Sequence, residues 1–428
     1  MKMLSRHSSL VTCHSSLVTS LALAAATASA TDGRYREYVI GERAGGMGGA
    51  AIAEAINVDA LFYNPAGLSR SKGDSLSLSA NLYGIEHYSK DGGSMWNQKD
   101  DSSSFVSIPG AMGGVKRLSS EWVGGFGVFT PKQEKRHLIA SYDNASNLSH
   151  YDYNDQTLWI GPAIAWAPSG SRFSLGAGLF GIYRDLSTSE NVWDQRTGSM
   201  SAAADLKTLG LLASVGAQLD LGDGWRVGAT VQSPNVRVWD DGTISISTSG
   251  EDDILSANGL GIYSEDVEAD NYIPWQFALG VGKTVPGKWG FAFDAIYHPS
   301  THFEIMKWNF GGFEVEQTMH LRQVIDVSLG GEYIVAENYP IRAGIYTAMS
   351  AVRLPDDPES TDLSTSDVDM LGITFSVGRR SENMSVNLGI DYAFGDGHDL
   401  TYDDSGNQIR TSCDRDVFLA TVSTTYYF

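Results

Sequence analysis

Alternation of apolar and polar residues is the feature of this sequence that most restricts its fold. Near the C-terminus, one parity is polar and the other is mainly apolar. The polar parity holds Thr421, Ser423 and Thr425, and the apolar parity holds Phe418, Ala420, Val422, Thr424, Tyr426 and Phe428. Successive side chains of a β-strand point to opposite faces. This stretch therefore predicts a strand with one apolar face and one polar face.

The same two-residue period recurs along most of the chain, in pairs of segments joined by short turns such as Val285-Pro286-Gly287. The predicted strands cover residues 75–85, 104–116, 122–130, 156–166, 172–185, 203–219, 224–234, 272–284, 288–299, 319–335, 339–350, 371–377, 384–394 and 416–428. This even set of fourteen suits a single-chain, porin-like transmembrane antiparallel β-barrel, all-β in class, with lipid outside and a polar interior. A soluble β-sandwich would expose so many aromatic side chains to water that it would aggregate.

Long polar segments separate the predicted hairpins, near residues 86–103, 131–155, 186–202, 235–271, 300–318, 351–368 and 395–415. Short turns on one side and long loops on the other are typical of outer-membrane barrels. We therefore expect the turns to be periplasmic and the polar segments to be extracellular loops. The aromatic residues Tyr426 and Phe428 resemble the assembly signal of bacterial outer-membrane barrels.

The N-terminal residues predict export. Lys2 and Arg6 precede an apolar run from Leu17 to Ala26 that ends in Ala28-Ser29-Ala30, which is the pattern of a signal peptide over residues 1–30. A lipoprotein signal at Cys13 is a poorer fit, because almost no apolar run precedes it. The net charge of -21 argues against nucleic-acid binding. We expect a monomer in the Gram-negative outer membrane, with lipid, lipopolysaccharide and the barrel-assembly machinery as partners.

Residues 31–74 break the alternation. A glycine- and alanine-rich stretch over 41–55 is followed by Asn64-Pro65, which requires extended or turn geometry. A short helix is expected over residues 50–56. Because this segment is too small to form its own domain, we predict a hatch over residues 31–74 inside the lumen of a barrel formed by residues 75–428.

One motif in this segment carries a family resemblance. Asp59-Ala60, followed by Tyr63-Asn64-Pro65-Ala66-Gly67-Leu68 just before the first strand, resembles the FadL-type family of outer-membrane transporters. The resemblance implies a fourteen-stranded barrel with an N-terminal hatch. It also implies passive uptake of hydrophobic small molecules, such as long-chain fatty acids or hydrocarbons, with lateral exit where a strand kinks. A related branch implies the alternative of a scaffold for protein secretion or surface attachment.

Two groups of residues are candidates for the transport path. The first is the expected ligand and gate set, which combines hatch residues with apolar residues of lumenal parity: Phe62, Asn64, Pro65, Ala66, Trp159, Phe180, Ile182 and Leu212. The second is a set of strand glycines that predict a kink, because glycine often marks a bend in a strand: Gly113, Gly114, Gly124 and Gly125. Alternatively, these glycines make room for the hatch.

Other patterns have weaker readings. Gly176 to Gly181 fits a dinucleotide motif but lies within a predicted strand. His298 and His302 have a metal-ligand spacing only on a helix, which Pro299 disfavours. Asp143, His150 and Asp152 could form the acid/base set of a barrel enzyme, although polar loops bring such residues together by chance. The sequence therefore predicts no enzyme, no cofactor and no metal site.

Overall fold

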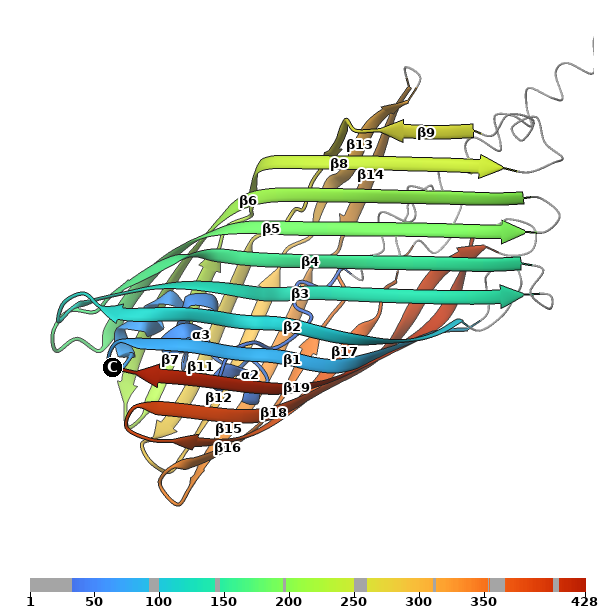
Figure 1. Ribbon diagram of the computed structural model, residues 1–428. Coiled ribbons are helices and arrows are strands. Elements are labelled where there is room, and N and C mark those ends of the chain that lie inside the picture. The colour runs from blue at the N-terminus through green and yellow to red at the C-terminus, as the bar shows by residue number, and fades with distance from the viewer. Residues whose placement is uncertain are drawn as a thin grey trace, which may run out of the picture.

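The computed structural model describes residues 33–91, 100–142, 147–194, 198–249, 260–310, 313–352, 354, 366–402 and 408–428. Within these residues, 14 antiparallel strands form a closed barrel (Figure 1). In order around the ring they are β1 (Ser75–Lys90), β2 (Asp100–Arg117), β3 (Trp122–Tyr142), β4 (Asn147–Trp166), β5 (Phe173–Asp194), β6 (Gly198–Gly222), β7 (Trp225–Gln232), β11 (Gln276–Val285), β12 (Trp289–His298), β15 (Val324–Val335), β16 (Tyr339–Ala348), β17 (Asp369–Arg380), β18 (Met384–Tyr402) and β19 (Gln408–Tyr427).

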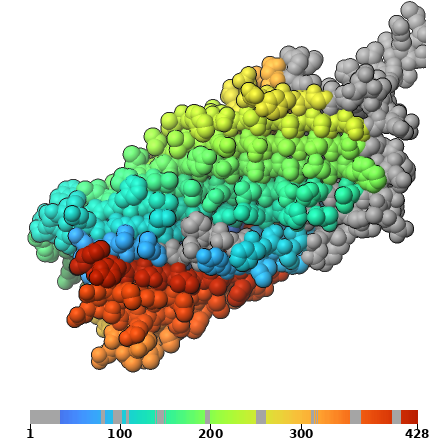
Figure 2. All heavy atoms as spheres, viewed as in Figure 1, coloured from blue at the N-terminus to red at the C-terminus, as the bar shows by residue number. Residues whose placement is uncertain are grey.

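Strands β1 and β19 close the ring by pairing from Ser75↔Tyr427 to Lys90↔Cys413. Figure 2 shows β19 in red directly beside the blue residues of β1. The backbone amide of Phe428 donates to the carbonyl of Asp74 at 3.0 Å, which extends the seam by one residue. The predicted fold class and strand number are confirmed.

The two faces of the barrel wall follow the alternation in the sequence. On β17 the outward residues Leu371, Ile373 and Phe375 are exposed, while Thr374 and Ser376, which have the other parity, are buried toward the interior. Lipid would cover the exposed apolar side chains of this face. None of the described helices is long and apolar enough to cross a membrane.

The polar segments predicted to be loops are instead largely strands. Strands β3 and β4 run on to Tyr142 and from Asn147, so that most of 131–155 is a hairpin. Five further strands stand on this side of the barrel: β8 (Val236–Ser249), β9 (Leu260–Ser264), β10 (Val267–Ala269), β13 (Thr301–Phe310) and β14 (Phe313–Leu321). The predicted strand 319–335 therefore spans the junction between β14 and β15. Parts of these strands alternate as well, such as residues 243–247 of β8, but they lie within segments that are long and polar overall. Their buried residues, among them Ile244 and Ile246, pack into an apolar cluster.

An apolar cluster holds this outer part together. Leu206 of β6, Ile244 and Ile246 of β8, and Trp308 of β13 are all buried in it. Strand β6 pairs with β7 near the short turns and with β8 farther out. In Figure 1, β8 and β9 consequently extend the wall above β6.

The segment before the barrel, residues 33–74, is here called the hatch segment. It contains α2 (Arg43–Gly46), α3 (Asn57–Tyr63) and the 3-10 helix η1 (Pro65–Arg70), and Figure 1 shows α2 and α3 behind the front wall of the barrel. The prediction of a short helix over residues 50–56 was wrong, because helix α3 begins only at Asn57. The chain turns at Gly48 and Gly49, which have positive φ. The carboxylate of Asp294 then accepts hydrogen bonds from the amides of Ala51 and Ile52. The predicted signal peptide, residues 1–30, lies outside the described residues.

Candidate functional site

The Asn64-Pro65-Ala66 motif fixes the hatch segment to one wall of the barrel. Asn64 is fully buried, and its Nδ2 donates to the carbonyls of Ile52 at 2.8 Å and Ala217 of β6 at 3.1 Å. Its Oδ1 accepts from the amide of Ala66 at 3.1 Å and so caps η1. A Cβ on Gly216 would lie 2.0 Å from this oxygen, so the wall fits the motif closely.

Charged contacts hold the opposite side of the hatch segment. Arg43 donates to Glu332 of β15 at 3.4 Å, and Glu332 also accepts from Arg342 and Arg380, each at 2.7 Å. Glu42 accepts from Asn387 of β18 at 2.7 Å and also from Thr425 of β19. These groups are buried or nearly so, and buried charges of this kind must be paired.

Backbone amides of the hatch segment are held by two carboxylates. Asp294 of β12 accepts from the amides of Ala51 at 2.5 Å and Ile52 at 2.8 Å. Within the segment, Asp59 accepts from the amides of Glu42, Arg43 and Ala44 at the start of α2. Burial raises the pKa of Asp59 to about 6 although these three hydrogen bonds favour its ionised form.

Toward β3, β4 and β5 the hatch segment is apolar. The ring of Phe62 lies 5.3 Å from the rings of both Phe129 and Trp159, measured between centroids. Phe180 lies behind them, 6.1 Å from Trp159. Contacts between these rings are carried by dispersion and by burial rather than by charge.

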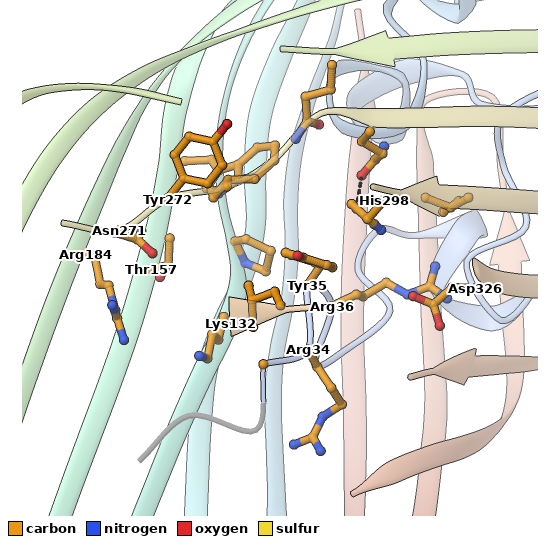
Figure 3. Close-up of a pocket in the computed structure, with 18 of the residues that line it drawn as sticks. Arg34, Tyr35, Arg36, Lys132, Thr157, Arg184, Asn271, Tyr272, His298 and Asp326 are labelled. Carbon is orange, nitrogen blue, oxygen red and sulfur yellow. Dashed lines mark hydrogen bonds between the residues drawn. The ribbon is translucent and has the colours of Figure 1, made fainter. Parts of the chain in front are cut away.

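A cavity of about 120 Å³ opens between the hatch segment and the outer strands (Figure 3). Phe62 and Trp159 line it together with apolar residues that come mainly from the outer strands and the approach to β11. Those additional apolar residues are Ile52, Ile273, Ile296, Phe303, Ile305, Met319 and Leu321. The lining is therefore mainly apolar, as is usual for small-molecule sites.

Four cations also line this cavity, and three of them have partners. Arg184 and Lys132 both contact Asp155, at 2.8 Å and 2.9 Å, and Arg34 contacts Glu37 at 3.1 Å. The fourth, Arg36, uses only Nη2, which donates to the hydroxyl of Ser328 at 3.1 Å and to the carbonyl of Thr347 at 3.2 Å.

Several buried donors of the cavity lining have no hydrogen-bond partner among the described residues. These atoms are Nε and Nη1 of Arg36, Nε1 of Trp159 and the hydroxyl of Tyr35. Figure 3 shows Arg36 beside Asp326, but Asp326 accepts instead from Thr347 and Met349. Burial raises the pKa of Tyr35, so its hydroxyl stays protonated. Buried polar atoms are rarely left unsatisfied, so we expect a water molecule or an acceptor group of a ligand to pair with these donors.

Strands β2 and β3 separate beside the hatch segment. Their ladder runs from Arg117↔Val123 to Ala111↔Phe129, and no pairing joins 100–110 to 130–142 among the described residues. A register shift between Phe129 and Lys132 coincides with Pro131, which cannot donate to a ladder. The amide of Glu37 donates to the carbonyl of Pro131 at 3.4 Å, so the hatch segment lies at this free edge.

The four predicted kink glycines lie within the regular ladder, before the register shift. A Cβ on Gly113 would come 3.3 Å from Val58, and one on Gly125 would come 2.9 Å from Leu61. Both contacts are with α3. Gly114 and Gly124 have no such contact with the hatch segment. For Gly113 and Gly125, the close fit supports the alternative that strand glycines make room for the hatch.

The structure divides the predicted ligand and gate residues into two sets. Phe62 and Trp159 line the cavity, whereas Phe180, Ile182 and Leu212 are buried in the wall behind it. Asn64, Pro65 and Ala66 anchor the hatch segment. Sequence reasoning missed Tyr35 and Arg36. The one pattern that could have pointed to them is the run Arg34-Tyr35-Arg36 shortly before the glycine-rich stretch. At the seam, Tyr426 and Phe428 are both exposed on the outer face.

Comparison with known proteins follows from this geometry. The model of the family "Outer membrane protein transport protein (OMPP1/FadL/TodX)" matches residues 21–428. Among functionally curated proteins, none matches the chain in sequence.

Solved structures share the fold at low sequence identity. The Pseudomonas putida toluene transporter TodX has a TM-score of 0.66 at 15% identity, with 92% of this chain and 99% of that chain covered. A Pseudomonas aeruginosa FadL homologue has a TM-score of 0.65 at 13% identity, covering 91% and 99%. The CymD monoaromatic hydrocarbon channel has a TM-score of 0.61 at 15% identity, covering 91% and 97%.

Proposed function

Because the chain belongs to the OMPP1/FadL/TodX family of outer-membrane transport proteins, as its motif predicted, we propose that it takes up hydrophobic molecules that carry an acidic head group, such as long-chain fatty acids. The family is one of transport channels rather than enzymes. The barrel supplies the pore, the hatch segment supplies the gate, and the cavity above the hatch segment is the binding site.

The observation that carries this proposal is the incompletely paired guanidinium of Arg36, whose Nε and Nη1 have no hydrogen-bond partner among the described residues, in a mainly apolar cavity. A carboxylate would accept from Nε and Nη1 and would satisfy both donors. Hydrogen bonds to charged groups contribute about 1.5–3 kcal/mol, and each buried methylene contributes about 0.8 kcal/mol. A neutral hydrocarbon would gain only the second contribution and would leave the donors unpaired.

Release into the bilayer is the second part of the proposal. The free edge of β3 beyond Phe129 lies beside the hatch segment, and the outer halves of β2 and β3 are not paired with each other. Pro131 also lines the cavity. When the segment around Glu37 moves away from Pro131 and their hydrogen bond breaks, a ligand in the cavity would leave sideways between these strands. This route delivers an apolar ligand into the bilayer of the outer membrane rather than directly into the aqueous periplasm.

The test is uptake by cells that lack other transporters for these compounds. With Arg36→Met, we expect fatty-acid uptake to fall about tenfold, because the variant loses one charge-assisted hydrogen bond to the head group. Toluene uptake should stay unchanged. Lys288→Met, at an exposed turn, is the matched control. Equal loss of both compounds would contradict recognition of the head group, and absence of uptake by the unmodified protein would contradict the transport function itself.

A further inference from the structure

Two histidines and an aspartate meet on the outward face of the extended β3–β4 hairpin. His137 of β3 lies directly opposite Asp152 of β4, and His150 is on the same face as Asp152. His137 Nδ1 is 2.6 Å from Asp152 Oδ1, and His150 Nε2 is 3.0 Å from Asp152 Oδ2. The ligand atoms of all three side chains lie within 4.8 Å of one another.

The contact between His150 and Asp152 is close, but it is not a hydrogen bond. Nε2 of His150 is shielded from solvent and has no hydrogen-bond partner despite its 3.0 Å distance from the carboxylate. The nitrogen therefore does not point along the line to the oxygen. When two side chains bind one metal ion at about 2.0–2.2 Å, their ligand atoms lie roughly 3 Å apart. Each ligand atom then points at the ion rather than at the other ligand atom. The arrangement of His150 and Asp152 fits this geometry.

We propose that His137, His150 and Asp152 bind a divalent transition-metal ion, with zinc as the reference ion. Two imidazoles and one carboxylate are ligands that zinc, copper and nickel prefer, whereas calcium and magnesium prefer oxygen alone. Three protein ligands leave one position open for water. The side chains are 54%, 36% and 48% exposed in that order, so an ion would approach through the more exposed His137 and Asp152.

The surroundings admit a cation. A hollow of about 650 Å³ begins at His137 and Asp152 and reaches across the outer face from Ser103 to Asp205. Lys135 and Arg136 also line this hollow, and Arg136 is paired with Glu134. The net charge of -21 attracts positive ions to the molecule as a whole. The ion would join β3 to β4 where β3 has no pairing with β2, and so would stiffen the hairpin.

Metal binding can be measured on the full chain purified in detergent without a histidine tag. We expect titration calorimetry to show one zinc ion bound per chain. Cobalt should also bind once per chain and should give the visible absorption bands of a cobalt site of low symmetry. His137→Gln and His150→Gln should each weaken zinc binding at least about tenfold, because each removes one of three ligands. Asp152→Asn should weaken it while keeping a side chain of the same shape.

The matched control is His302→Gln. His302 of β13 stacks on His320 of β14 at 6.0 Å between ring centroids. Among the described residues, this pair belongs to no group of three potential metal ligands. Unchanged zinc affinity in this variant supports the proposal. A loss there equal to the loss in His137→Gln, a need for millimolar zinc in the unmodified protein, or calcium binding as tight as zinc binding would each overturn it. Circular dichroism of every variant separates loss of the site from loss of the fold.

Discussion

The hatch segment is held by charge on one side and by apolar packing on the other. Toward β15, β18 and β19, Glu42 and Arg43 enter buried networks around Glu332 and Asn387. Toward β3, β4 and β5, Phe62 packs against aromatic rings, and the amide of Glu37 adds a hydrogen bond to Pro131. Ionic contacts depend strongly on geometry, whereas apolar contacts can be exchanged for those of a ligand. If the hatch segment is the gate, as proposed, we expect it to stay fixed on its charged side and to yield on its apolar side.

The largest effect should come from breaking the charged side. Glu332→Gln leaves the fully buried Arg342 side chain without its carboxylate, and removing one partner of a buried ion pair costs about 3–5 kcal/mol. Urea unfolding in detergent, followed by tryptophan fluorescence, measures the loss. Glu314→Gln removes an exposed partner of Lys307 and should cost less than about 1 kcal/mol. Equal losses in the two variants would mean that the network does not anchor the hatch segment.

An intermediate effect is expected where the wall meets Asn64. Gly216→Ala places a methyl group 2.0 Å from the Asn64 side-chain oxygen, and such overpacking costs about 1–3 kcal/mol. We expect a normally assembled barrel with a displaced hatch, detected as leakage of small polar solutes into cells. Gly261→Ala has nothing within 4 Å of the added Cβ and serves as the control. Failure of the barrel to assemble would instead make this contact part of the folding core.

The smallest effect separates wall residues from cavity residues. Ile182→Val removes one methylene from the wall behind Trp159 and should cost about 0.5–1.5 kcal/mol of stability with uptake unchanged. Phe62→Ala removes a cavity side chain and should lower uptake more than stability. Uptake kinetics beside unfolding curves test this, and a loss of uptake in Ile182→Val would place Ile182 on the ligand path after all.

Sequence reasoning found the parts of the fold that depend on a local period. Residues 371–377 and 384–394 alternate because one face meets lipid, and this pattern is visible in any short window. The outer strands β8 and β13 lie within long segments that are polar overall, so these segments were predicted to be loops. Contacts such as Glu42 with Asn387 join residues far apart in the chain, and no local pattern specifies them. Arg36 was missed because only the assembled cavity shows that its guanidinium is buried and incompletely paired.

The seam between β1 and β19 has a consequence for the order of folding. Ser77 and Thr425 share a hydrogen bond across 348 positions of the chain. Joining strands so distant carries the loop-closure entropy of nearly the whole barrel, and such non-local pairing makes folding slow. Strand β1 therefore keeps an open edge until β19 has been exported, and an exposed edge invites aggregation. A chaperone that shields this edge during transit would matter more for this protein than for a protein whose strands pair only with their neighbours in the sequence.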